Sequence, residues 1–423
     1  MADDINNIND GEEKSHKNER HLYNKNAEGN EGLGDANEMD DETEFEKPVR
    51  KTKSRKKKGI LKYIIAAIVL LAVIRAGIDF FGGNKNGPEK EETVINDQID
   101  LDTSSKYDFN IFENYLIVCN KYGVYAYNAS GSVKWKYETN ITDPISSTCG
   151  DYLLVTDTTQ NNSIMFNNHG ELKNKVSYET DCITAEPNNN GWITAIVRQK
   201  GYKAQINVYN SEGKLKYSWS SANNNVLAAS LADDNKTLAV AQLDSSSSDE
   251  ANGVVSLFDI TTAGKPYFGK NTGSNIITYI RWNGEKLTCV GGSKTFRINK
   301  NGSDLWKYSY PSGDMVLYNA KSNGVYAYAI NSNSTSASKI TTIYTISDDG
   351  KQLGSTKIEG DVHSIETRGN KIAVITSNSI ITLRRNATVK KINNLSKDIS
   401  KGLVFDSNAF VVSGTSAEII PIN

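Results

Sequence analysis

The sequence repeats one ten-residue pattern, which reads Asn128-Ala-Ser-Gly-Ser-Val-Lys-Trp135-Lys-Tyr137 in one copy and Asn299-Lys-Asn-Gly-Ser-Asp-Leu-Trp306-Lys-Tyr308 in another. In both copies an asparagine stands three residues before a glycine, and a tryptophan stands four residues after it. Asparagine before such a turn hydrogen-bonds the local backbone, and glycine adopts the left-handed conformation without strain. The pattern therefore predicts a tight turn between two strands.

Short apolar strands recur around these turns. Eight occur, with starts 37 to 49 residues apart: Tyr115–Val118, Tyr152–Val155, Trp192–Val197, Thr237–Val240, Lys286–Val290, Val325–Tyr328, Lys371–Ile375 and Ala409–Val412. Most are followed by a strand of alternating character, a turn and another strand. Four strands in a period of about 40 residues are typical of propeller blades. The sequence predicts an all-β, eight-bladed β-propeller of four-stranded blades.

The turns carry a second regularity. The position three residues before the glycine is Asn128, Asn167, Asn210 and Asn299, and the position four residues after it is Trp135, Tyr217, Phe268 and Trp306. We interpret these four aromatic residues as blade-docking residues that pack between neighbouring blades. A ligand-binding aromatic platform is the alternative.

These turns resemble the tryptophan-docking repeat of PQQ-like (quinoprotein-type) propellers, a family that is typically eight-bladed. The resemblance covers roughly residues 105–423 and weakens in the last three blades, where Gly350 is followed by Gly354 at the aromatic position. The layout is also similar to membrane-tethered, uncharacterised members from Gram-positive bacteria. The last repeat has no fourth strand of its own. We expect the segment 93–101 to supply it and close the ring.

The segment before the propeller has a different composition. Between Asp3 and Glu46 there are fifteen acidic and four basic residues, which predicts a disordered tail or a docking segment for a cytoplasmic partner. A basic run follows, formed by Lys51, Lys53, Arg55, Lys56, Lys57 and Lys58. Residues 59–81 are apolar enough for one retained transmembrane helix, with a signal peptide as the rival interpretation.

The basic run sets the expected orientation, because positive residues flank the cytoplasmic end of a span. We predict a cytoplasmic tail at 1–58, a span at 59–81, a linker at 82–92 and an extracytoplasmic propeller at 93–423 of a single-pass protein of the cell membrane. The basic run beside a span favours anionic lipid over nucleic acid. A net charge of -2 agrees with the absence of a nucleic-acid partner.

Catalytic motifs are not evident. Enzymes of the resembled family use Ca²⁺, a catalytic aspartate and two adjacent cysteines, whereas Cys119, Cys149, Cys182 and Cys289 are far apart. The resemblance therefore implies a fold without cofactor or metal, and no small-molecule substrate is indicated. The cysteines are expected to be buried thiols. His16, His21, His169 and His363 are scattered, and we expect ordinary surface or loop roles for them.

Two loops are unusually long, Leu243–Gly253 in blade four and Asn331–Ser338 in blade six. They are either solvated insertions or a partner surface that includes Asp244, Asp249, Glu250, Asn331 and Asn333. The favoured function is a binding or scaffold module in the cell envelope, with an envelope protein or a cell-wall polymer as partner. An enzyme with an axial cofactor or substrate site and a transmembrane sensor are the alternatives.

Overall fold

The computed structural model describes residues 96–244, 251–262, 264–320, 324–331, 340–405 and 407–422. The regular elements of these residues are 32 β-strands. Within these ranges no helix is long and apolar enough to span a membrane. The predicted tail, basic run, span and linker lie outside the described residues.

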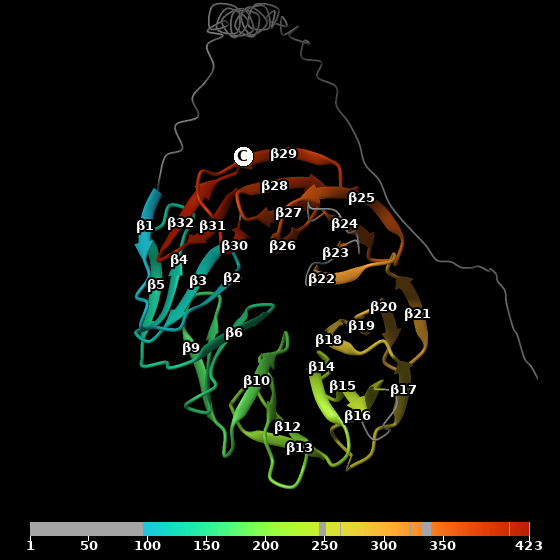
Figure 1. Cartoon of the computed structure of the whole chain (residues 1–423). Coiled ribbons are helices and arrows are strands. Elements are labelled where there is room, and N and C mark those ends of the chain that lie inside the picture. The colour runs from blue at the N-terminus through green and yellow to red at the C-terminus, as the bar shows by residue number, and fades with distance from the viewer. Residues whose placement is uncertain are drawn as a thin grey trace, which may run out of the picture. The chain divides into compact units, whose positions relative to one another are not determined.

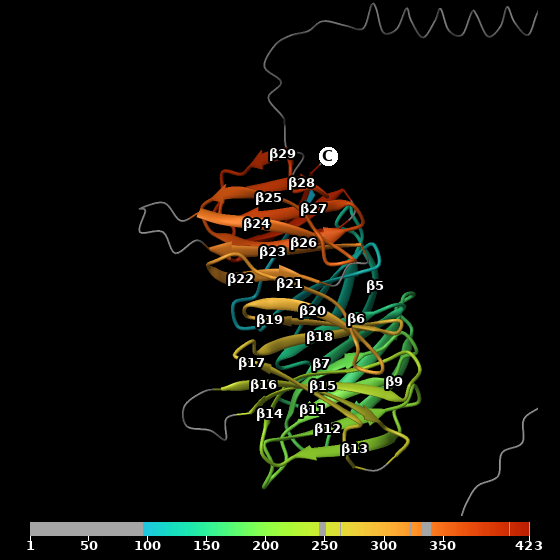
Figure 2. The ribbon, with the colours of Figure 1, turned by 90° about the vertical axis from the view of Figure 1, so that its right-hand side faces the viewer.

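The strands form eight antiparallel four-stranded sheets arranged around one axis, as Figure 1 shows. Each sheet is a blade, and the predicted eight-bladed propeller is confirmed. In blades one to seven the four strands follow one another in the chain from the axis to the rim. Figure 2, the view turned by 90°, shows the strands running between the two faces of the ring.

The four strands of a blade are named by their place, from the axis outward. The innermost strands are β2 (Asp108–Phe112), β6 (Pro144–Cys149), β10 (Cys182–Pro187), β14 (Asn225–Leu231), β18 (Ile277–Asn283), β22 (Asp314–Asn319), β26 (Val362–Arg368) and β30 (Lys401–Phe405). The second strands are β3 (Tyr115–Asn120), β7 (Tyr152–Asp157), β11 (Ile193–Val197), β15 (Thr237–Asp244), β19 (Lys286–Gly291), β23 (Val325–Asn331), β27 (Lys371–Thr376) and β31 (Asn408–Ser413). The third strands are β4 (Gly123–Tyr127), β8 (Asn162–Asn167), β12 (Ala204–Tyr209), β16 (Asn252–Asp259), β20 (Lys294–Asn299), β24 (Ile340–Ser347), β28 (Ser379–Arg384) and β32 (Ser416–Pro421). The outermost strands are β5 (Val133–Glu138), β9 (Leu172–Ser177), β13 (Leu215–Ser221), β17 (Phe268–Gly273), β21 (Asp304–Ser309), β25 (Gln352–Glu359), β29 (Val389–Asn394) and β1 (Asn96–Asp100).

The core lies between the blades. The second strands are buried on both faces, because each face packs against a neighbouring blade; all five residues of β11 are buried. Strands covered on both sides are continuous apolar runs, which explains the eight apolar segments of the sequence. The outermost strands alternate between exposed and half-buried residues, as in Val133–Glu138 of β5.

The ring is closed by the strand expected from the sequence. Strand β1 pairs antiparallel with β32, with Asn96 opposite Ile419 and Asp100 opposite Ser416. It thereby becomes the outermost strand of blade eight. The chain then passes to β2 of blade one, so the first and last parts of the propeller are joined by backbone hydrogen bonds and no open sheet edge is left at this point.

The two faces of the ring differ in their connections. One face carries the turns that follow the innermost strands and the turns that follow the third strands, and β1 begins at this face because Asn96 is opposite Ile419, near the end of β32. We call it the entry face. The other face carries the connections between second and third strands, including those after Asp244 and Asn331, and we call it the long-loop face.

Candidate functional site

The turn residues at the entry face adopt the predicted geometry. The Asn128 side-chain oxygen accepts hydrogen bonds from the backbone N–H groups of Ser130 and Ser132, both at 3.0 Å. The Gly131 N–H donates to the Asn128 carbonyl at 3.0 Å. Asn167, Asn210 and Asn299 hold their turns in the same way.

The four predicted docking aromatics lie at seams between blades. The ring of Trp135 in blade one covers Gly170 in the turn of blade two, where an added Cβ would lie 2.4 Å from the ring. Gly170 also has φ +78°. A side chain at this position would therefore clash with the Trp135 ring and strain the backbone. Phe268 covers Gly302, and Trp306 covers Gly350, in the same way. Tyr217 packs in the core between blades three and four.

The seam between blades five and six has an additional ionic clamp. Arg297 is 1% exposed, and its Nη1 lies 2.8 Å from Oδ1 of Asp348. Its Nε donates to Thr288 Oγ1 at 3.1 Å, and its guanidinium carbon lies 5.6 Å from the Trp306 ring centroid. Burial opposes ionisation of Asp348, but hydrogen bonds from Tyr326 and Arg297 lower its pKa. Sequence reasoning did not identify this pair.

The predicted partner surface is described only at its edges. Asp244 ends β15 and Asn331 ends β23, both at the long-loop face. The Asn331 side-chain oxygen accepts a hydrogen bond from Thr341 Oγ1 at 2.7 Å. Asp249, Glu250 and Asn333 lie outside the described residues, as do Lys51, Lys53, Arg55, Lys56, Lys57 and Lys58.

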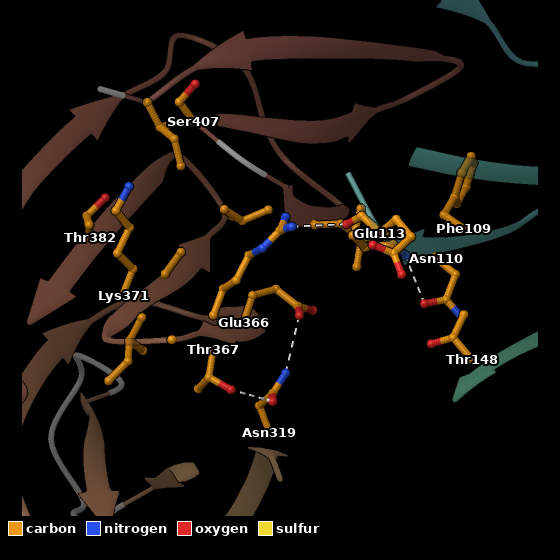
Figure 3. Close-up of a pocket in the computed structure, with 18 of the residues that line it drawn as sticks. Phe109, Asn110, Glu113, Thr148, Asn319, Glu366, Thr367, Lys371, Thr382 and Ser407 are labelled. Atoms are coloured by element: carbon orange, nitrogen blue, oxygen red, sulfur yellow. Dashed lines mark hydrogen bonds between the residues drawn. The ribbon is translucent and has the colours of Figure 1, made fainter. Parts of the chain in front are cut away.

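A cavity of about 1010 Å³ lies at the entry face. Its walls come from blades one, two, six, seven and eight, so it extends from the ring axis into the seam between blades seven and eight. Figure 3 shows Lys371 and Thr382 on one side and Asn110 and Thr148 on the other. A volume of this size suits a small ligand or a head group. It is the principal candidate site in the described part of the chain, and sequence reasoning did not predict it.

The axial part of the cavity is polar and already hydrogen-bonded. Asp108 accepts a hydrogen bond from the Ser146 N–H at 2.8 Å. Glu366 accepts one from Asn319 Nδ2 at 3.2 Å. Arg368 donates to the Glu113 carbonyl at 3.1 Å and joins blade seven to blade one. These contacts orient the acids and fix the inner wall.

The outer part of the cavity, between blades seven and eight, has another character. Lys371 and Lys390 are exposed and line it beside the apolar Val404 and Ile422. Thr382 also lines it and is 8% exposed. The Thr382 hydroxyl is buried without a hydrogen-bond partner among the described residues. A buried hydroxyl without a hydrogen-bond partner costs free energy in the folded protein.

The seam opens here for a topological reason. In the other blades a turn joins the third strand to the outermost strand and contacts the preceding blade. In blade eight the outermost strand is β1, from the N-terminal side of the propeller, so no turn joins it to β32. Blade seven also has Ala387 in the left-handed turn position, with φ +61°, and Lys391 four residues later instead of an aromatic. The missing aromatic and the basic run Arg384–Lys391 were the sequence signals for this site.

No other chemistry-bearing cluster stands out in the described ranges. They hold no group of three or more His, Cys, Asp or Glu side chains placed to bind a metal ion. The four cysteines are free and buried, as expected. His169 is exposed at a turn, and His363 is exposed with its Nε2 2.9 Å from Ser377 Oγ.

Several solved structures are similar in fold. One is BamB from Moraxella catarrhalis, with 14% identity over 78% of this chain and 97% of that chain and a TM-score of 0.47. Another is the Cps50 (Swd1) β-propeller domain from Myceliophteria thermophila, with 12% identity, 78% and 99% coverage and a TM-score of 0.44. A third is apo AztD from Citrobacter koseri, with 9% identity, 70% and 95% coverage and a TM-score of 0.45.

At these identities the likeness concerns the fold alone. No curated protein matches the sequence. A family model, described as a family of unknown function (DUF5711), matches residues 86–422, which is nearly the whole propeller. The chain therefore belongs to the DUF5711 family.

Proposed function

We propose that this protein is a binding or scaffold module of the cell envelope, held to the membrane by residues 59–81 with the propeller outside the cytoplasm. The β-propeller fold is consistent with a binding or scaffold module. The basic run and the apolar stretch support the anchor and its orientation. The repeats support a PQQ-like propeller, and the wide spacing of the four cysteines in the sequence supports binding without catalysis.

The observation that carries the proposal is the position of β1. It begins at the entry face, so the linker joins the propeller there. The linker of eleven residues, 82–92, reaches at most about 40 Å when extended. In this arrangement the entry face is turned toward the bilayer. The connections after Asp244 and Asn331 emerge from the long-loop face and are presented to an envelope protein or wall polymer.

Loop replacement tests which surface is used. Both long connections, 245–251 and 332–339, are replaced by Asn-Gly turns in the full-length protein, which is then crosslinked in its own membranes and recovered. We expect normal folding, because the strands are retained, and loss of the crosslinked partners. Alanine substitution of Tyr202 and Lys203, in the corresponding connection of blade three, serves as the control. Recovery of the same partners by the shortened protein would place the binding surface elsewhere.

Protease protection tests the topology. Protease added to intact spheroplasts is expected to digest residues beyond about 85 and to spare the tail. Digestion of the tail instead would refute the anchored arrangement.

Calorimetric titration with PQQ and Ca²⁺ is expected to give no saturable heat, and a micromolar site would refute the non-catalytic assignment.

A further inference from the structure

Blade seven carries a cluster of cations at the entry face. Arg368 and Lys371 flank the turn after its innermost strand, and Arg384, Arg385 and Lys390 flank the turn after its third strand. The two turns are adjacent, because Lys371 lies directly opposite Arg384 in the sheet. We call these five residues the basic seam. None of them forms an ion pair with a described residue.

Several lysines near the corresponding turns of other blades have acidic partners. Lys214 pairs with Glu212 in blade three at 2.9 Å. The same arrangement holds for Lys173 with Glu171, Lys270 with Asp304, and Lys351 with Asp349. Blade seven differs in that five cations without an acidic partner among the described residues surround two adjacent turns. Like charges held together without counter-charges favour an anionic partner.

The cavity continues from these cations into the protein. Lys371 and Lys390 line its outer part, with Arg368 further in. Thr382 lies directly opposite Ala373 in the sheet, two residues from Lys371, so its hydroxyl is on the same face of blade seven as the Lys371 side chain. That hydroxyl is buried and unpaired. Val404 and Ile422 complete an apolar wall. A lining of cations, a hydroxyl and apolar side chains suits a ligand with an anionic group on an apolar chain.

The cavity mouth is also close to the point where the chain enters the propeller. Ile422, which lines it, is three residues beyond Ile419, and Ile419 is opposite Asn96 at the start of β1. This step rests on the proposed anchoring: a linker of at most about 40 Å limits how far the mouth can lie from the bilayer surface. Lysine and arginine clusters held at that surface are attracted to anionic lipid head groups.

We propose that the basic seam and the outer cavity bind the phosphate head group of an anionic phospholipid. Lys371 and Lys390 supply point charges to the phosphate, and the Thr382 hydroxyl donates a hydrogen bond to it. The Val404 and Ile422 side chains contact the glycerol and the first acyl carbons. The lipid thereby fixes the rotation of the propeller on its tether, with the long-loop face outward.

The test uses the full-length protein in a neutral detergent, which removes the bilayer but retains the anchor. Dioctanoyl phosphatidylglycerol is titrated, with dioctanoyl phosphatidylcholine and glycerol 3-phosphate in parallel, and the thermal unfolding midpoint is recorded. We expect a saturable rise in the midpoint with phosphatidylglycerol and none with phosphatidylcholine. The variant Lys371→Glu/Lys390→Glu should bind about tenfold more weakly or worse. The matched control is Lys134→Glu/Lys216→Glu, on outermost strands of blades one and three, which should bind as the wild type does.

Three results would overturn the proposal. The first is the absence of a shift with phosphatidylglycerol. The second is an equal loss of binding in the control variant, which would mean diffuse attraction to the whole face. The third is a shift with glycerol 3-phosphate as large as that with the lipid, which would assign the site to a soluble phosphate. Because this measurement does not depend on topology, its failure is distinct from a failure of the protease experiment.

Discussion

The seam between blades one and two and the seam between blades seven and eight are built in opposite ways. In the first, Trp135 lies flat over Gly170 and leaves no room for a Cβ. In the second, a turn and an aromatic are both missing, and a cavity with Lys371, Thr382 and Lys390 takes their place. The repeat motif closes the first seam, and the cavity lies at a seam where both the aromatic and the neighbouring turn are missing.

Removing β1 should have the largest effect on either seam, because it opens the ring. A chain beginning at Asp102 loses the pairing of β1 with β32 and exposes a sheet edge in blade eight. We expect it to aggregate, while a chain beginning at Asn84 remains monodisperse in size-exclusion chromatography. Equal thermal stability of the two chains would show that strand donation does not hold the ring closed.

Gly170→Ala tests the docked seam. The new methyl group would meet the Trp135 ring, and the positive φ adds backbone strain, so we expect a loss of about 3 kcal/mol of unfolding free energy. The control is Gly369→Ala at the open seam, which has φ +56° but no atom within 4 Å of the new methyl group. It should cost about 1 kcal/mol from strain alone. Urea denaturation measures both, and equal losses would argue that Trp135 does not seal its seam.

Asp348→Asn tests the ionic clamp that reinforces the seam between blades five and six. Loss of its charge leaves the buried Arg297 without a counter-ion, and we expect a cost of about 2 kcal/mol, reduced because the Asp348 side chain is 40% exposed. The pKa of Asp348 is lowered in the folded protein. Its contribution is therefore present above about pH 4 and lost as the pH falls through the folded value. The stability difference between wild type and variant should shrink in acid, and a constant difference would contradict the clamp.

Thr382→Val tests whether the hydroxyl at the open seam has a structural role. Valine keeps the shape and removes an unpaired buried hydroxyl, so we expect the protein without ligand to be unchanged or stabilised by about 1 kcal/mol, and lipid binding to weaken. Thr156→Val in blade two is the control, because the Thr156 hydroxyl lies 2.7 Å from Ser163 Oγ and its loss should destabilise by about 1 kcal/mol. Destabilisation by Thr382→Val would mean that its hydroxyl has a structural partner.

Local patterns made the fold predictable. Asn128 and Gly131 reveal a turn, Trp135 reveals the packing beside it, and eight copies of the apolar strand reveal the blade number. The closure by β1 followed from the incomplete last repeat. In each case the information lies within one repeat or at its ends.

The cavity was not predictable in the same way. Asp108, Arg368 and Lys390 are far apart in the chain and meet only because the ring closes between blades eight and one. The sequence search favoured long loops, whereas the cavity is formed by short turns and a missing connection. The unpaired state of Lys371 also depends on which acids other blades place nearby, and a linear pattern does not contain that information.

Hydrogen exchange of the full-length protein in lipid nanodiscs shows which seam between blades contacts the anionic lipid. Exchange is compared between nanodiscs of phosphatidylcholine alone and nanodiscs that also contain phosphatidylglycerol. If lipid binds at the basic seam, exchange in residues 368–373 and 384–391 of blade seven should be slower when the anionic lipid is present, while residues 128–137 of blade one should be unchanged. Unchanged exchange in blade seven, or equal protection of blade one, would contradict lipid binding at the basic seam.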